Sequence, residues 1–368
     1  MNKKIMSIIT TLLFAVVLIS VSAVCLLKPA TAYSEGERRE LAKSPEFSLG
    51  ALFGGEFMES FEAYATDQFP ARESLRSLKA WFAYNIFGKS DNNGLFCAQG
   101  HLSELEYPQN DEMLRFAAEK FTFLYEKFIK DTEAKVYLSI VPDKNMFIAE
   151  KNGYLAMDYE KFASDFAAKV DFMQYIDIFP LLSADDYYTT DSHWRQEKII
   201  HVAEHIAQKM GTSVSAEYEQ ISLNLPFKGV YAGQAAVPVK PDEIIYLTND
   251  SLASSVVTYY NTGMPEQGNM YNMEKASGKD PYEVFLSGTA PLITIENPQA
   301  SGEKELVIFR DSFGSSIAPL FAEGYKKITV VDIRYLQSDF VGNFVKFTNQ
   351  DVLFLYSTTL LNNSTALR

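Results

Sequence analysis

The pattern of apolar and polar positions begins with an unbroken hydrophobic segment. Residues 5–27 carry no charged side chain, and Lys3 and Lys4 stand just before them. A helix of this length rises about 35 Å at roughly 1.5 Å per residue, which is enough to cross a hydrocarbon core of about 30 Å. Because basic residues stay on the cytoplasmic side, the pattern predicts a membrane-crossing segment with the rest of the chain outside the cytoplasm.

Two interpretations of this segment remain open. Ala30, Thr31 and Ala32 form the small-x-small pattern that suits signal peptidase, so the protein would be secreted if it were cut after Ala32. The apolar run is longer than the roughly 7–15 residues of a cleavable signal, and this length favours an uncleaved anchor. We therefore predict a cell-membrane protein with an extracytoplasmic domain, in which residues 1–32 are a signal anchor or a signal peptide.

The remaining chain alternates between helical and extended patterns. Apolar residues at helical spacing predict helices over residues 57–64, 75–87, 111–128, 159–172, 194–210 and 315–323. Continuous apolar runs predict buried strands over residues 135–141, 175–182, 305–309, 327–333 and 351–356. Buried strands that alternate with helices are typical of an α/β fold with a mainly parallel sheet and helices on its faces.

The patterns also suggest how the exported part is organised. Residues 33–110 are polar and broken, which predicts an N-terminal helical or irregular region. Residues 111–368 carry the strands and helices of one large domain. Within that domain, residues 212–300 show only short extended pieces with many Gly, Pro and Asn, so we expect a less regular insertion there.

Charge and cysteine content narrow the possible functions. The net charge is −14, and no basic tract follows the N-terminus. Nucleic acids are held mainly by Lys and Arg on phosphates, so a nucleic-acid partner is disfavoured. Of the two cysteines, Cys25 lies in the apolar segment and Cys97 is left alone, so we expect no disulfide framework in the exported part.

The first candidate for chemistry is Ser312. It follows the apolar run 305–309 and precedes the helical pattern 315–323, so it sits at a tight turn between a strand and a helix. A serine lifted off the end of a strand can act as a nucleophile, and the backbone N–H groups of Ser312 and its neighbours could stabilise an oxyanion. The other interpretation is an ordinary helix N-cap, which serine fills very commonly.

A nucleophilic serine needs a base, and the chain has four histidines. His193 follows Asp191 by two residues, so in an extended loop the two side chains point to the same side. The carboxylate could then hold one imidazole nitrogen while the other faces Ser312. Alternatively, Asp191 or Ser192 caps the helix predicted over residues 194–210.

His201 and His205 spell H-x-x-E-H, an inverted zinc-protease pattern. The helical periodicity, however, places both histidines opposite the apolar face formed around Val202 and Ile206. A zinc site would need them in a cleft with a further carboxylate ligand, and none can be singled out. We therefore favour a solvated face and expect neither a metal nor a resident cofactor.

Taken together, these motifs resemble a known family. Thr190-Asp191-Ser192-His193-Trp194, followed by Arg310-Asp311-Ser312-Phe313, resembles the DHHW proteins of Gram-positive bacteria. These are relatives of the extracytoplasmic alginate O-acetyltransferases in the SGNH hydrolase-like superfamily. Further similarity lies in the stretches Glu37–Ala42, Ser44–Ser48, Asp67–Arg72, Val141–Lys144 and Val331–Tyr335.

The resemblance implies a fold and a reaction. The fold would be the SGNH hydrolase-like three-layer α/β fold. Ser312 would be the nucleophile, His193 the general base and Asp191 its orienting partner, in an enzyme that transfers an acetyl group to a cell-envelope or exported polysaccharide. Ser192 replaces the first histidine of the family's motif but leaves Asp191 and His193 in place.

Partners and substrate contacts follow from the same resemblance. It implies a polysaccharide acceptor and a membrane-bound O-acyltransferase that supplies the acetyl group. Trp194, Arg310, Lys144 and Arg334 are the predicted substrate-binding residues. For the three basic ones, a supporting position behind the residues that contact substrate is the second possibility, and a surface salt bridge is the role favoured for any one of them. Two other functions remain open, namely a polysaccharide acetyl esterase and a non-catalytic glycan-binding or scaffold protein.

Overall fold

The structure is a computed structural model that describes residues 3–34, 36–214, 217–300 and 302–368. Its contacts divide the chain into two compact units, Met1–Asn92 with Ala232–Pro238, and Asn93–Tyr231 with Val239–Arg368. Each unit is described by itself.

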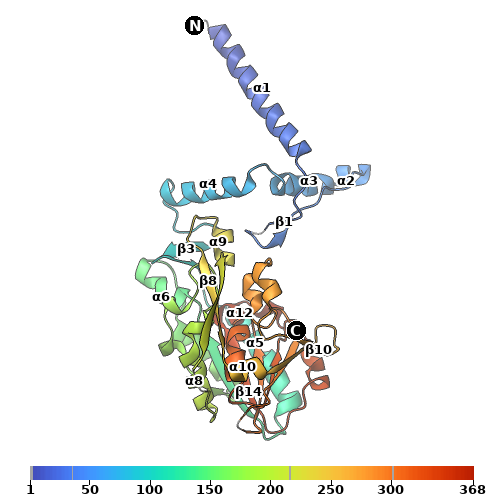
Figure 1. The fold of residues 1–368 in the computed structure, drawn as a ribbon. Coiled ribbons are helices and arrows are strands. Elements are labelled where there is room, and N and C mark those ends of the chain that lie inside the picture. The colour runs from blue at the N-terminus through green and yellow to red at the C-terminus, as the bar shows by residue number, and fades with distance from the viewer. Residues whose placement is uncertain (1–2, 35, 215–216, 301) are drawn as a thin grey trace. The chain divides into compact units, whose positions relative to one another are not determined.

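The larger unit contains an eight-stranded sheet in the order β10-β9-β11-β13-β12-β14-β5-β6 (Figure 1). The five strands from β13 to β6 run parallel, and β10, β9 and β11 extend the sheet in antiparallel fashion. The strands are β5 (Lys135–Val141), β6 (Gln174–Tyr175), β9 (Val256–Tyr259), β10 (Glu266–Gly268), β11 (Leu292–Glu296), β12 (Glu305–Arg310), β13 (Lys327–Val331) and β14 (Asp351–Ser357).

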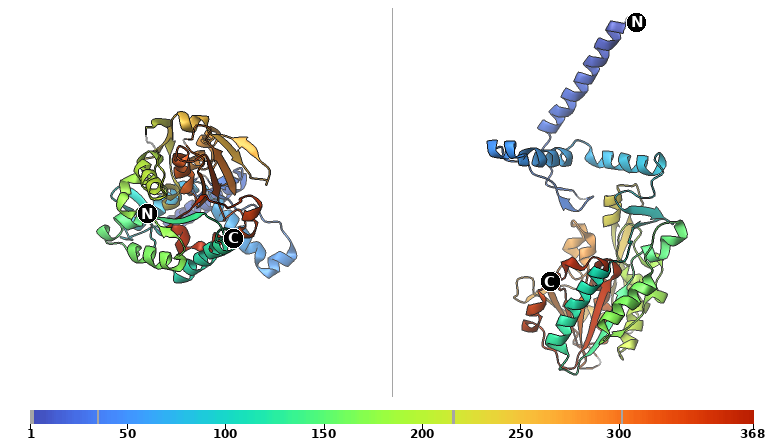
Figure 2. Two further views of the ribbon diagram at one scale, coloured as in Figure 1. Left: turned by 90° about the horizontal axis from the view of Figure 1, so that it is seen from below. Right: turned by 180° about the vertical axis from the view of Figure 1, so that it is seen from behind.

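Helices cover both faces of this sheet (Figure 2). Along β12, Leu306 and Ile308 point into one hydrophobic core, while Val307 and Phe309 point into the other. One core includes residues of α8 (Ile200–Lys209) and α11 (Gly314–Ile317), and the other includes residues of α5 (Asp111–Leu124), α7 (Tyr159–Ala167) and α12 (Thr358–Asn362). The predicted three-layer α/β fold with a mainly parallel sheet is therefore confirmed.

Most of the predicted elements are present within a few residues. β5 spans the predicted residues, and β12 and β14 each run one residue further, because continuous apolar runs of this length suit a strand buried on both faces. α5 continues into a π-helical turn over Tyr125–Ile129, which together cover the predicted helix. α7 is followed by a 3₁₀ turn, Ala168–Val170.

Three predictions of secondary structure need correction. The strand predicted over residues 175–182 ends at Tyr175, and a 3₁₀ turn with Pro180 follows over Phe179–Leu181. The helix predicted over 194–210 begins with the turn Gln196–Lys198 before α8. The helix predicted over 315–323 is only α11 followed by a 3₁₀ turn, Ala318–Phe321, because Pro319 lacks the N–H that a longer helix needs.

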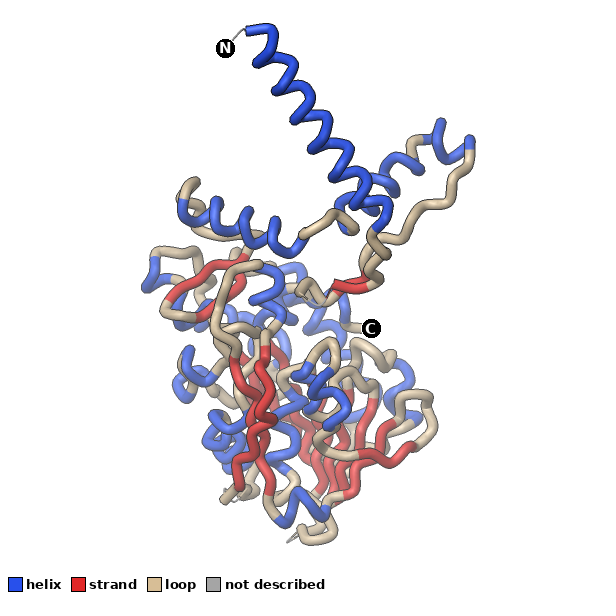
Figure 3. Tube along the Cα trace, turned by 45° about the horizontal axis from the view of Figure 1, so that its top comes forward, coloured by secondary structure: helices blue, strands red, loops and turns tan. Residues whose placement is uncertain are grey.

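The segment 212–300 contributes more to the fold than its sequence pattern suggests. β7 (Glu219–Phe227) and β8 (Asp242–Thr248) pair into a two-stranded ribbon, seen as two long red strands in Figure 3. β9, β10 and β11 come from the same segment and complete one edge of the main sheet. Shorter elements of the larger unit are β3 (Leu95–Ala98), β4 (His101–Glu104), α6 (Asn145–Ile148) and α10 (Asp250–Ser254), and α9 is Val230–Ala235.

The smaller unit begins with the long apolar helix α1 (Lys3–Leu27). Residues Lys3–Cys25 of this helix are long and apolar enough to cross a membrane, and none of that stretch is buried in the protein. The unit then contains β1 (Tyr33–Ser34), β2 (Arg39–Glu40), α2 (Leu49–Gly54), α3 (Glu56–Asp67) and α4 (Arg72–Asn85).

An ion-pair network holds these short elements together. Asp67, at the end of α3, is buried and accepts two hydrogen bonds from the Arg39 guanidinium and one from the Ala42 amide. The Arg39 hydrogen bonds lower the pKa of the Asp67 carboxyl to about 2. Arg72, in the first turn of α4, lies 3.5 Å from the same carboxylate and also pairs with Glu37.

Candidate active site

Polar residues follow the carboxyl ends of four adjacent parallel strands. Asp332 follows β13, Asp311 and Ser312 follow β12, Ser357 ends β14, and Asp143 comes two residues after β5. All four strands point the same way, so these residues gather at one edge of the sheet. In open α/β sheets this edge is where ligands are usually bound.

Ser312 occupies the turn between β12 and α11 and is half-buried. Asp311 fixes this turn, because its carboxylate accepts hydrogen bonds from the Phe313 amide at 3.0 Å and the Ser357 amide at 2.8 Å. Gly314 allows the chain to fold back closely, since a Cβ atom there would lie 2.5 Å from Cβ of Arg310. These contacts fix the turn internally and against the neighbouring strand β14.

His193 connects Ser312 to Asp191. Its Nε2 lies 2.8 Å from Oγ of Ser312, and its Nδ1 lies 2.6 Å from Oδ1 of Asp191. The Asp191 side chain is completely buried, whereas the His193 side chain keeps 12% of its surface exposed. A buried carboxylate, an imidazole and a half-buried hydroxyl therefore form one continuous hydrogen-bonded chain.

The Asp191 carboxylate is held in place by backbone groups. Oδ1 accepts a hydrogen bond from the His193 amide at 3.1 Å, and Oδ2 accepts one from the Val230 amide at 2.8 Å. The preceding residue, Gly229, approaches so closely that a Cβ atom there would lie 2.3 Å from Cβ of Asp191. Only glycine fits at this position without displacing the carboxylate or the segment that contacts it.

Asp242, at the start of β8, clamps the loop that carries Asp191. Its Oδ1 accepts hydrogen bonds from the amide and hydroxyl of Thr189 at 3.0 and 2.8 Å. Its Oδ2 accepts hydrogen bonds from the amide and hydroxyl of Thr190 at 2.8 and 2.6 Å. Four bonds to one carboxylate fix two consecutive residues immediately before Asp191.

Aromatic side chains position the imidazole. Tyr282 stacks on the His193 ring with centroids 3.9 Å apart and planes 9° apart, and its hydroxyl lies 2.9 Å from Oγ of Ser316. The Trp194 indole N–H donates to the same Oγ at 2.9 Å and to the Phe313 carbonyl at 3.1 Å. We refer to residues 189–194, which carry Asp191 and His193, as the histidine loop. Trp194 and Tyr282 therefore connect the histidine loop to α11, the helix that follows Ser312.

Lys144 is buried beneath the histidine loop. Its ammonium donates to the Tyr188 carbonyl at 2.8 Å and to the Thr189 carbonyl at 3.4 Å, and it lies 5.2 Å from the centre of the Tyr231 ring. Burial lowers the pKa of Lys144 to about 7, although Asp191 and other carboxylates nearby oppose the shift. Lys144 thus supports the loop from inside.

Arg310 and Arg334 share the carboxylate of Asp332. Arg334 makes a bidentate contact with it at 2.9 and 2.7 Å and keeps 18% of its side chain exposed. Arg310 lies 3.4 Å from the same carboxylate, is 1% exposed, and donates to the Asp311 and Gly288 carbonyls.

The residues predicted to carry the chemistry lie together, whereas most of those predicted to bind substrate do not line the surface. Trp194, Arg310 and Lys144 are buried and bonded to protein groups. For Arg310 and Lys144 this is the supporting position that the sequence left open, and contact of Trp194 with substrate stays a prediction. Arg334 is the one of the four with exposed surface. The catalytic roles of Ser312, His193 and Asp191 stay predictions.

The surroundings of Asp191 and His201 bear on the alternative roles predicted for them. Asp191 bonds the His193 and Val230 amides, and the first helical turn after it begins only at Gln196. His201 is exposed and its Nε2 lies 2.8 Å from the Leu181 carbonyl, on the polar face predicted for it. Among the described residues, no cluster of three or more His, Cys, Asp or Glu could hold a metal ion.

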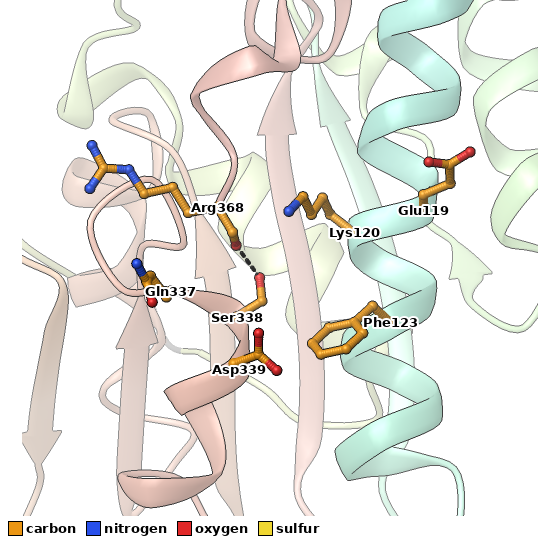
Figure 4. Close-up of a pocket in the computed structure, with 7 residues that line it drawn as sticks. All are labelled: Glu119, Lys120, Phe123, Gln337, Ser338, Asp339 and Arg368. Carbon is orange, nitrogen blue, oxygen red and sulfur yellow. Dashed lines mark hydrogen bonds between the residues drawn. The ribbon is translucent and has the colours of Figure 1, made fainter.

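A pocket in the surface of the larger unit lies away from Ser312. A pocket of about 390 Å³ is formed between α5 and the 3₁₀ segment Ser338–Asn343 (Figure 4). Lys120 and Phe123 line it from α5, and Asp339 and Arg368 line it from the other side. The described residues that line it do not include Ser312.

A serine at the carboxyl end of a central parallel strand lies within hydrogen-bond distance of a histidine, which is bonded in turn to an aspartate of its own loop. This is the placement that the sequence resemblance to the DHHW proteins implies. No family model and no curated protein matches the chain.

The structure of this chain is similar to several solved structures. A DHHW family protein from Eubacterium siraeum is similar with a TM-score of 0.60 and 22% identity, over 75% of this chain and 94% of its own. PatB1 from Bacillus cereus is similar with a TM-score of 0.57 and 18% identity, over 73% of this chain and 96% of its own. The O-acetyltransferase domain of Pseudomonas putida AlgJ aligns with a TM-score of 0.45 and 13% identity, over 73% of this chain and 92% of its own. The likenesses to the DHHW family protein and to PatB1 confirm, at the level of the fold, the resemblance found in the sequence.

Proposed function

We propose that this protein is an extracytoplasmic O-acetyltransferase that moves an acetyl group through Ser312 onto a hydroxyl of a cell-envelope or exported polysaccharide. The observation that carries the proposal is the hydrogen-bonded chain from Asp191 through His193 to Ser312, with distances of 2.6 and 2.8 Å. Nucleophile, base and orienting carboxylate within hydrogen-bond reach are the requirement for activating a serine.

The reaction has two balanced steps. Oγ of Ser312 attacks the acetyl carbonyl while Nε2 of His193 takes the hydroxyl proton, and His193 then gives this proton to the departing donor oxygen. In the second step His193 takes the proton of the sugar hydroxyl, whose oxygen attacks the acetyl carbon. The Ser312 oxygen leaves and takes the proton back, so the enzyme is restored. Asp191 stabilises the imidazolium in both steps.

The backbone of the turn supplies a donor for the oxyanion. The amides of Phe313, Gly314 and Ser315 already donate within the turn. Within the part of the chain that the structure describes, the Ser312 amide has no such acceptor, so we assign it to the carbonyl oxygen of the acetyl group. Removing one oxyanion donor typically costs about 10²–10³ in kcat.

The location of the site supports a membrane-bound source of acetyl groups. α1 precedes the site-bearing unit and is long enough to anchor the chain in the cytoplasmic membrane. Acetyl-CoA stays in the cytoplasm, so an outer enzyme needs a partner that passes acetyl groups across, and we propose a membrane-bound O-acyltransferase in this role. Tethering both in one membrane raises their effective concentration.

Acetyl transfer can be tested directly with the purified full chain. The chain is incubated with a chromogenic acetyl ester and an oligosaccharide acceptor, and the acceptor is analysed by mass spectrometry. We expect acetylated oligosaccharide with the wild type and none with Ser312→Ala or His193→Ala. Because PatB1 has been solved with a sulfonyl adduct, a sulfonyl fluoride is a suitable inhibitor to include.

The other outcomes point to the two alternative functions. Free acetate without acetylated acceptor, lost in the same variants, would indicate an acetyl esterase, because the same three residues serve both reactions. No turnover by the intact protein with any ester would favour a non-catalytic glycan-binding or scaffold role.

A further inference from the structure

The smaller unit exposes many large apolar side chains on α3 and α4. In a water-soluble unit such side chains are scattered singly, whereas contiguous exposed apolar faces mark an interaction surface. The exposed members on these two helices are Met58, Phe61, Leu75, Leu78, Trp81 and Phe82. We refer to them as the apolar faces of α3 and α4.

On α4 these side chains form a stripe. Leu75, Leu78 and Phe82 recur at intervals of three and four residues and are 45%, 49% and 40% exposed. Trp81 stands beside Phe82 with their rings in edge contact at 5.2 Å. The buried residues of the helix, Ala80 and Ala83, lie on a different face. The helix therefore has one buried face and a separate apolar face that is exposed.

α3 has the same character with an acidic opposite face. Met58 and Phe61 are 56% and 46% exposed and share one side of the helix. Glu56 and Glu59 lie on the other side and are exposed to water. An amphipathic helix with an unpartnered apolar face is typical of a helix that lies in a membrane interface.

A hydrogen-bonded tie brings these faces close to the membrane segment. Gln68, the residue after α3, accepts a hydrogen bond from the Thr31 amide and donates one to the Thr31 carbonyl, both at 2.8 Å. Thr31 is four residues after Leu27, the last residue of α1. Four residues span at most about 14 Å, so Thr31, which is bonded to the Gln68 side chain, lies within about that distance of the end of the membrane-crossing helix.

We propose that the apolar faces of α3 and α4 lie in the interfacial layer of the same bilayer that α1 crosses. The occupant of this surface is the lipid itself, and it needs no anionic headgroup. α3 carries acidic residues and no basic ones, and Arg72 and Arg76 of α4 are paired with Glu37 and Glu73. Attraction to negatively charged lipids therefore does not explain this surface. Burial of apolar and aromatic side chains at the headgroup boundary does.

The two tryptophans make this proposal testable in the full chain. Trp81 is 49% exposed, whereas Trp194 is completely buried in the larger unit. The full chain is reconstituted into phosphatidylcholine vesicles that contain lipids brominated near the glycerol or near the bilayer centre. Bromine quenches tryptophan on contact, and Trp81→Phe gives the signal of Trp194 alone for subtraction.

We expect the Trp81 fluorescence to be quenched by brominated lipid and protected from aqueous acrylamide. Quenching should be stronger with bromine near the glycerol, because interfacial helices lie about 5–10 Å into the headgroup–acyl boundary. The result should be unchanged in 0.5 M salt, about a 3–4 Å screening length, since the contact is apolar.

Two variants separate the apolar faces from a general effect of exposed residues. The triple variant Leu75→Ser, Leu78→Ser, Phe82→Ser should lose most of the lipid quenching of Trp81. A control triple variant in the larger unit should leave it unchanged, and it consists of Leu155→Ser, Val256→Ser and Phe340→Ser, which are similarly exposed. Circular dichroism checks that both variants keep their helices.

Three results would overturn the proposal. Trp81 open to acrylamide and not quenched by lipid would place the surface in water. Trp81 protected from both agents would mean that a protein, either a second copy or a membrane partner, covers it. Mature protein from the native host that begins at Tyr33 would lack α1 and Thr31, and so would have no tether.

Discussion

Replacing Asp242 by asparagine removes the clamp on the histidine loop without changing the size of the side chain. The carboxylate accepts hydrogen bonds from two amides and two hydroxyls, of Thr189 and Thr190. Asparagine keeps one acceptor oxygen and places an NH₂ group where the other oxygen was. The threonine hydroxyl that faces the NH₂ group can rotate and accept a hydrogen bond from it. The backbone N–H of the same threonine cannot accept, so it loses its partner.

The expected loss of stability and of turnover follows from the number of hydrogen bonds that are removed. A hydrogen bond to a charged group contributes about 1.5–3 kcal/mol, and leaving a partly buried N–H without a partner costs about 1–3 kcal/mol. Part of this destabilises the fold and part displaces Asp191, which is the next residue after the clamped pair. Since about 1.4 kcal/mol corresponds to a tenfold change in rate, we expect kcat for acetyl-ester turnover to fall about 10–100-fold, with a smaller change in KM.

The matched control is Glu243→Gln. Glu243 is the neighbouring residue in β8, it is exposed, and its replacement changes the charge by the same amount. We expect its turnover to stay within about twofold of the wild type, as is usual for an exposed site. Turnover is measured together with urea unfolding of each variant. Unchanged kcat in a folded Asp242→Asn protein would refute the assigned role of the clamp.

Three further predictions concern the surroundings of the same loop. Gly229→Ala places a methyl group against the Asp191 side chain, so we expect ester turnover to fall at least tenfold, with a lowered melting temperature checked in parallel. Tyr282→Leu removes the ring stacked on His193 and should reduce kcat about two- to tenfold, whereas Tyr282→Phe keeps the ring and should stay closer to the wild type. Lys144→Met should flatten the pH dependence of the free energy of unfolding, as measured with urea. The pKa of Lys144 is about 7 in the folded protein and about 10.5 in the unfolded chain, so the unfolded chain binds more protons between these values. The free energy of unfolding of the wild type should therefore rise by up to about 1.4 kcal/mol per pH unit from pH 7 to 9.

The strands of the fold could be predicted because their side chains are buried on both faces. β5, β12 and β14 are continuous apolar runs, and such runs allow few other structures. The strand predicted over 175–182 fails because Pro180 and the Asp177 side chain, which accepts from the Phe179 amide, favour a turn. The pattern of apolar residues over 175–182 does not reveal the contacts of that turn with the rest of the fold.

The short strands β9 and β10 could not be predicted from local pattern. They are four and three residues long, and all three residues of β10 are exposed, so neither offers a buried run long enough to mark a strand. β9 pairs with β11, and β10 pairs with β9, and these contacts form only when the sheet assembles.

Some residues of the candidate site could likewise be predicted from the sequence, and others could not. Asp191 and His193 could be found because they are two residues apart, and Ser312 because it lies at a strand–helix junction. Asp242, Tyr282 and Gly229 were missed, because each is far in sequence from the loop that it contacts. Gly229 stands before α9 without any motif, and Asp242 resembles any acidic residue at the start of a strand.

The position of Trp194 could not be predicted from the sequence. Trp194 lies next to the candidate histidine and is among the residues predicted to bind substrate. The structure shows its indole N–H bonded inside the protein, and the side chain has no exposed surface. Sequence alone does not separate these two uses, because both place a large aromatic side chain beside a reactive group.

The central claim is that His193 activates Ser312 to form an acetyl-enzyme, and rapid-quench mass spectrometry tests it most directly. The full chain is mixed with an acetyl ester, stopped in acid and digested, and the peptide that contains Ser312 is analysed. We predict an added acetyl group on Ser312 in the wild type, none in Ser312→Ala, and formation slowed about 10²–10⁴-fold in His193→Ala. Ester turnover by the wild type with no acetyl group on Ser312 at any time, or with equal rates in His193→Ala, would contradict the account.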